Sequence, residues 1–207
     1  MLRMSRFVLP SLVAVWLALL NPLASAQPFY QDQTLEIHDL PNLIARTHDP
    51  SDVLLTSLDT ILHDKAICCG RDSALEDSAQ QADPKSLKDV ATKLDGRHLL
   101  SDGRPILVTA QFLTPDAVSS GGLISALLDQ RAAVMLWNSH LYVVHGIVFI
   151  WTPDYSPEGG GSTTSVIRKI LLWDTRYSDA RREVVFDRET EDPNKVQGLL
   201  FLKWAPQ

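Results

Sequence analysis

Cysteine is scarce in this chain. Its 207 residues include two cysteines, Cys68 and Cys69, and these are adjacent. Adjacent cysteines cannot link distant segments, so the disulfide frameworks of small secreted domains are excluded. Three interpretations stay open for the pair: a reactive thiol, two metal ligands, or two inert buried residues with or without a vicinal bridge.

Basic charge is also in short supply. Nineteen Lys and Arg residues stand against 25 Asp and Glu, which gives a net charge of -6. Nucleic acids and anionic membrane surfaces attract basic patches, and this sequence has none. We therefore expect no nucleic-acid partner. Glycine-rich phosphate loops, a serine nucleophile elbow and EF-hand loops are missing too, so nucleotide, serine-hydrolase and calcium sites have no support.

The first 26 residues have the features of a cleavable secretory signal. Two arginines precede an apolar run over 7–20, and a small-residue triplet follows at 24–26. This order is typical of signal peptides. The apolar run is shorter than the roughly 18 to 20 residues that cross a bilayer, so we expect no stable membrane anchor after cleavage. Residues 1–26 are expected to be removed, and 27–207 to form a single domain in the periplasm or outside the cell.

Helical patterns come first along the chain and strand patterns later. Apolar residues at helical spacing predict helices over 51–63, 71–82, 84–95 and 115–130. Segments rich in β-branched and aromatic residues predict strands over 105–112, 132–137, 140–151, 165–173, 183–186 and 197–204, with a hairpin loop over 153–162. The sequence therefore predicts an α+β fold in which N-terminal helices pack on a C-terminal antiparallel sheet.

Three kinds of chemically active residue stand at the ends of these elements. Cys68 and Cys69 precede the predicted helix over 71–82, His140 opens a predicted strand, and Asp174 closes the next one. Cys69-Gly70, the run 140–146 and the run 169–174 resemble the papain-like cysteine peptidases, especially the bacterial branch that processes double-glycine leader peptides. The resemblance spans about residues 60–175.

That resemblance implies a papain-like fold and a peptide or protein substrate. Carried over by motif, it implies that Cys69 is the nucleophile, His140 the base and Asp174 the orienting acid. The leader-processing branch has a glutamine six residues before its cysteine, where the amide helps to hold the oxyanion. In this chain that position is His63, whose ring can also donate a hydrogen bond.

Physical chemistry supports these roles without the family. A helix N-terminus stabilises a thiolate, a histidine can take the thiol proton, and a carboxylate can orient the ring. A one-residue shift in register would exchange Cys68 and Cys69.

Each of these residues also has a plainer interpretation. His140 can be a turn residue, and Asp174 can be a solvated acid or a partner for Arg176. His145 lies five positions after His140, so an unbroken strand would put it on the opposite face, where a structural role is expected. The histidines that could join the cysteines around a metal are scattered over different elements, and no metal or cofactor is expected; they are His38, His48, His63, His98 and His140.

Two functions follow from the sequence. One is an exported thiol-dependent peptidase or amide hydrolase with a Cys-His-Asp arrangement. The other is a noncatalytic secreted protein that uses the same fold to bind a peptide or a partner protein.

Overall fold

The computed structural model describes residues 31–41, 43–62, 75–100, 102–114, 120–129, 131–155, 161–177 and 182–207. Within these ranges the chain is a mixed α+β protein with a large antiparallel sheet and a few helices, as the sequence predicts. The expected signal peptide lies outside them, and so do His63, Cys68 and Cys69.

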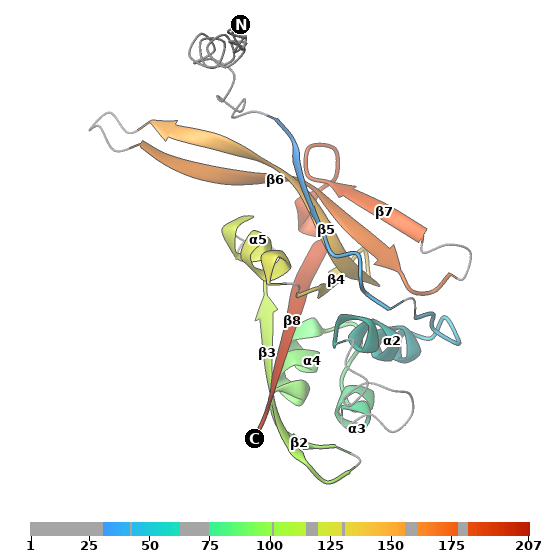
Figure 1. The fold of residues 1–207 in the computed structure, drawn as a ribbon. Helices are drawn as coiled ribbons and strands as arrows, with labels where there is room; N and C mark the ends of the chain where they lie inside the picture. Colours follow the sequence, from blue (N-terminus) through green and yellow to red (C-terminus); the bar gives the residue numbers. More distant parts are fainter. Residues whose placement is uncertain are drawn as a thin grey trace, which may run out of the picture.

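One antiparallel sheet organises the described chain (Figure 1). Its strands follow the order β2-β3-β8-β4-β5-β6-β7. β4 pairs with the first part of β5, over 140–144, and β1 pairs with the next part, over 146–149. The strands are β1 (Gln33–Glu36), β2 (Gly96–Leu99), β3 (Pro105–Leu113), β4 (Ala133–Trp137), β5 (His140–Tyr155), β6 (Gly161–Asp174), β7 (Arg182–Asp187) and β8 (Val196–Pro206).

Helices cover both faces of this sheet. α2 (Pro50–Leu62) and α4 (Leu87–Leu94) lie on one face, and α5 (Ser120–Leu128) lies on the other (Figure 1). The short helix α3 (Glu76–Gln80) contacts both α2 and α4. No helix in the described ranges is long and apolar enough to cross a membrane.

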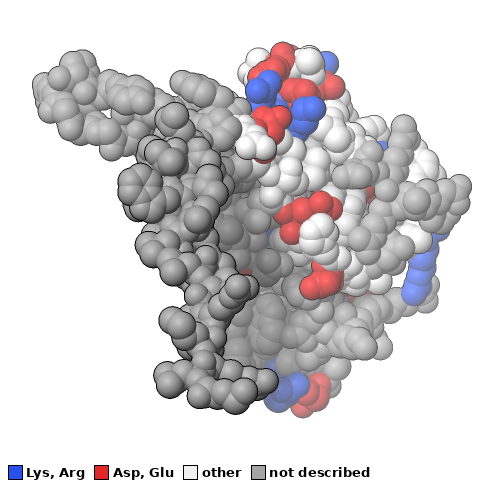
Figure 2. Space-filling model, turned by 45° about the horizontal axis from the view of Figure 1, so that its top comes forward, with Lys and Arg blue, Asp and Glu red and all other residues white. Residues whose placement is uncertain are grey.

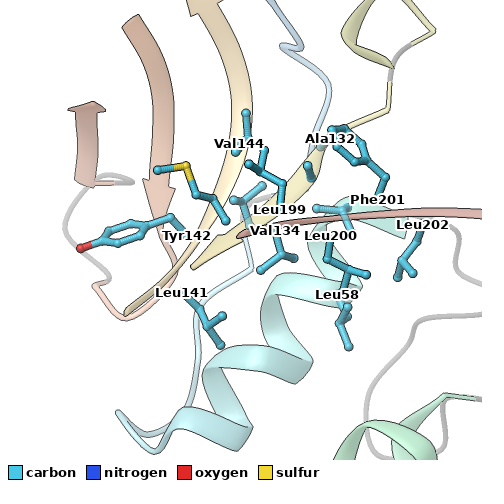
Figure 3. Packing of buried hydrophobic residues seen from close by; sticks show 14 of the residues in the cluster. Leu58, Ala132, Val134, Leu141, Tyr142, Val144, Leu199, Leu200, Phe201 and Leu202 are labelled. Carbon is cyan, nitrogen blue, oxygen red and sulfur yellow. The ribbon is translucent and has the colours of Figure 1, made fainter. Parts of the chain in front are cut away.

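The core lies where the central strands are covered on both faces. β4 is buried along its whole length, because it lies between β8 and β5 within the sheet and α2 packs against it. On one face Leu58 of α2 packs near Leu200 of β8 (Figure 3). Tyr142 of β5 points the other way, with its hydroxyl directed out of the cluster (Figure 3).

β5 and β6 extend beyond their neighbours as a two-stranded ribbon (Figure 1). β1 pairs with β5 as far as Phe149, and β7 pairs with β6 from Lys169 onward, whereas the pairing of β5 with β6 continues to Tyr155 opposite Gly161. The loop predicted over 153–162 is therefore too long, since both strands continue into that range.

Helix boundaries differ from the prediction at two places. The helix predicted from residue 84 begins after Ser86, because Ser86 Oγ accepts the N–H of Asp89 and so caps the first turn. The helix ends at Leu94, close to the predicted end at residue 95, and Gly96, whose φ is 130°, opens β2. The helix predicted over 71–82 is described as α3, and the start of the predicted range lies outside the described residues.

On the face drawn in Figure 2, the described Lys and Arg residues lie in small groups mixed with Asp and Glu residues. The described part of that face therefore offers no site for a polyanion.

Candidate functional site

His140 stands directly after the turn that joins β4 to β5. Asn138 and Ser139 both have a positive φ, 51° and 62°, as a two-residue type I′ turn requires. The turn sets His140 opposite Trp137 at the first position of β5, and the histidine is exposed. The prediction that His140 opens a strand is confirmed.

Asp174 ends β6 at the same end of the sheet and is buried, with 2% of its surface exposed. Arg176, two residues later, folds back over it. Arg176 Nε donates to Asp174 Oδ1 at 2.7 Å, and Nη2 donates to Oδ2 at 2.6 Å. This two-pronged hydrogen bonding raises the pKa of Arg176 above its ordinary value, so the buried carboxylate keeps a permanent cation beside it.

The same guanidinium reaches His140. Its Nη1 lies 2.8 Å from Nδ1 of the histidine ring. Arginine can only donate hydrogen bonds, so Nδ1 accepts, and the proton of the neutral ring is on Nε2. Arg176 therefore stands between His140 and Asp174 and contacts both.

Arg176 is held from other sides as well. Its carbonyl oxygen lies 3.0 Å from Nε2 of His48, which precedes α2. Its guanidinium carbon lies 5.6 Å from the centre of the Tyr142 ring and 5.7 Å from that of Tyr177, within the range of cation–π attraction. We call the four residues His140, Tyr142, Asp174 and Arg176 the arginine cluster.

The other β5 histidine, His145, lies on the face opposite His140, because it stacks on Trp173, which pairs with Val143; the alternation of an unbroken strand does not decide its face, since a bulge interrupts β5 here. It sits at a β-bulge between Val144 and Gly146 and is 1% exposed. Its ring stacks on Trp173 at 4.2 Å between centroids, and its Nδ1 lies 3.4 Å from Oε1 of Glu36. His145 therefore packs β1 onto β5 on the face opposite His140.

The structure thus brings together two of the candidate residues. His140 and Asp174 both contact Arg176. Cys68, Cys69 and His63 lie outside the described residues, so the predicted distance between a cysteine sulfur and the His140 ring stays a prediction. Asp174 is buried, so it is not a solvated acid, and its contacts are those of a partner for Arg176. The signal was the presence of arginine two positions after the acid, where the chain turns back at the strand end.

In the described part of the chain, no group of three or more His, Cys, Asp and Glu side chains is arranged to hold a metal ion. No protein-family model, curated protein or solved structure matches this chain.

Proposed function

We propose that this chain is an exported protein that binds polypeptides without cleaving them, on a papain-like α+β fold. One observation carries the proposal: Arg176 donates to Nδ1 of His140 and to both carboxylate oxygens of Asp174. The order of cysteine, histidine and acid along the chain supports the papain-like part, and the contacts of Arg176 support the absence of cleavage.

Thiol catalysis needs two features of its histidine. One nitrogen must have a lone pair open to the thiol proton, and the other must carry a proton directed at the acid. In the arginine cluster the lone pair of Nδ1 is directed at Arg176, and the protonated Nε2 has none to offer. Asp174 is engaged by the same guanidinium. The side chain of Arg176 therefore engages both residues that the thiol would need, the base and the acid that orients it.

Polypeptide is the ligand class that suits the described architecture. Extended chains add to exposed sheet edges through backbone hydrogen bonds, and this chain has a broad antiparallel sheet with a two-stranded ribbon. The net charge of -6 argues against nucleic acid.

A thiol peptidase is the second candidate, and one observation favours it: His140 and Asp174 lie at the same end of the sheet, one guanidinium apart. In that case Arg176 must leave the ring before catalysis. The Cys69 proton then passes to Nδ1, the thiolate attacks the peptide carbonyl, and the imidazolium returns the proton to the leaving amine.

Incubation with a pool of defined synthetic peptides separates the two candidates. Native mass spectrometry of the mature protein should show complexes with intact peptides, and the free peptides should keep their length. Peptides shortened by the wild type but not by Cys69→Ala or Cys68→Ala would establish the peptidase. The absence of any complex would contradict binding.

A further inference from the structure

β2 forms an outer edge of the described sheet. It pairs with β3 on one side, and in the described part of the chain no strand pairs with its other side. Leu100 and Arg104 are the next opposite pair after Leu99 and Pro105, and Leu100 N donates to Arg104 O at 2.9 Å, so they are a hydrogen-bonded pair. Bonded and non-bonded pairs alternate in an antiparallel ladder, so the backbone N–H and C=O groups of Arg97 and Leu99 point away from β3.

The side chains beside that edge form an uncovered surface. The register of β2, β3 and β8 sets exposed residues on the face opposite α4, and we call seven of them the β2 face: Arg97, Leu99, Pro105, Leu107, Thr109, Lys203 and Ala205. Their neighbours on the α4 side, such as Ile106 and Val108, are buried. The contrast shows that the helix layer covers one side of these strands.

The β2 face combines apolar and basic groups. Leu99 is 67% exposed and Leu107 is 38% exposed, although both are large apolar side chains. Its two charged members, Arg97 and Lys203, are both basic, and neither forms an ion pair with the described residues. This local charge is opposite in sign to the net charge of -6 of the whole chain.

We propose that the β2 edge binds, by strand addition, an extended segment of another protein in which every second residue is in turn apolar and acidic, so that both kinds share one face of the segment. Backbone groups of Arg97 and Leu99 would pair with the segment. Alternate side chains of the segment would then lie over the β2 face, where apolar groups meet Leu99 and acidic groups meet Arg97. The proposal rests on the polypeptide-binding function above and names its site and its ligand chemistry.

A second copy of this chain fits the edge less well. Pairing of two β2 strands would join two β2 faces into one surface, with the basic groups of both copies close together, and like charges in such positions are destabilising. The chain as a whole is acidic, which further opposes self-association.

Fluorescence anisotropy with three labelled octapeptides tests the proposal on the mature protein. The first is Val-Thr-Glu-Thr-Val-Thr-Glu-Thr, in which valine and glutamate share one face of the extended chain, the second has lysine in place of both glutamates, and the third is the first with N-methyl groups on alternate backbone nitrogens. The first should bind saturably at one site per chain. The other two should bind at least about tenfold more weakly, because they lose the charge match or the backbone hydrogen bonds.

Three variants locate the site. Arg97→Glu should weaken binding of the glutamate peptide and strengthen binding of the lysine peptide, whereas Lys88→Glu, an equal charge change on the exposed side of α4, should alter neither. Leu99→Pro should weaken binding, because it removes an outward N–H that β3 does not use.

The proposal is overturned if the N-methylated peptide binds as well as its parent, if Arg97→Glu has no more effect than Lys88→Glu, or if the glutamate peptide does not bind. It is also overturned if sedimentation reveals a dimer that Leu99→Pro dissociates. Binding that is insensitive to these variants would leave the polypeptide-binding function intact and move its site. Cleavage of a peptide that depends on Cys69 would instead remove that function.

Discussion

Nη1 of Arg176 lies 2.8 Å from Nδ1 of His140. This contact joins an exposed ring at the start of β5 to a buried carboxylate at the end of β6, through a guanidinium that holds both. The arrangement stabilises this end of the sheet. It also engages the lone pair of His140 Nδ1, which a histidine base would need for the thiol proton.

The arginine cluster should contribute to stability through its buried ion pair. Arg176→Ala leaves the 2%-exposed Asp174 without its cation, and removal of one partner of a buried pair costs about 3 to 5 kcal/mol. Urea unfolding should show this loss, with a smaller loss for Arg176→Lys, which keeps the charge without the planar fork. Arg104→Ala, which breaks an exposed pair with Asp102, is the control and should unfold like the wild type. Equal stability of Arg176→Ala and Arg104→Ala would contradict the account.

Cysteine reactivity should not depend on His140. If Arg176 holds the ring, His140→Ala should leave the rate of iodoacetamide modification of Cys68 and Cys69 unchanged, as should the control His38→Ala at an exposed position. Peptide mapping by mass spectrometry gives the two rates. A clear slowing in His140→Ala alone would indicate a thiolate paired with that ring and favour the peptidase.

Gly146 allows β1 to approach β5. A Cβ at this position would lie 2.8 Å from the carbonyl oxygen of Leu35 and 3.0 Å from Leu171 Cδ1. Gly146→Ala should therefore push β1 from the sheet and cost about 1 to 3 kcal/mol, as overpacking does. Hydrogen exchange should then be faster at the β1 amides than in the control Ser125→Ala on the exposed side of α5. Unchanged protection of β1 would show that the strand tolerates the displacement.

The expected signal peptide gives a prediction about the mature chain. The small residues at 24–26 place cleavage before Gln27. Mass spectrometry of exported protein should find Gln27 as the first residue, with the net charge changed to -8 by the loss of Arg3 and Arg6. Functional protein that keeps Met1, or that stays with membranes after a carbonate wash, would rule out this cleavage.

Much of the fold follows from local sequence patterns. The strands β3 to β8 were predicted because each contains a run of Val, Ile, Leu and aromatic residues that is bounded by turn residues. β1 and β2 were not, because four-residue segments such as Gln33–Glu36 carry no clear alternation and become strands by pairing with β5 and β3. The extra length of β5 and β6 likewise comes from their mutual pairing.

The candidate site was less predictable than the strands. Chain order was enough to bring His140 and Asp174 to the same end of the sheet. It could not decide whether Asp174 faces a histidine or an arginine, since that depends on the turn by which Arg176 folds back over β6.

The protonation of the His140 ring is the most direct test of the proposed loss of catalysis. Long-range proton–nitrogen NMR on the mature protein, at a pH of about 8 and above the usual titration range of imidazole, distinguishes the two ring nitrogens. The contact with Arg176 predicts a proton on Nε2 and an unprotonated, hydrogen-bonded Nδ1, and Arg176→Ala should alter the Nδ1 signal. A proton on Nδ1 in the wild type would contradict the account and leave Nε2 open to act as a base.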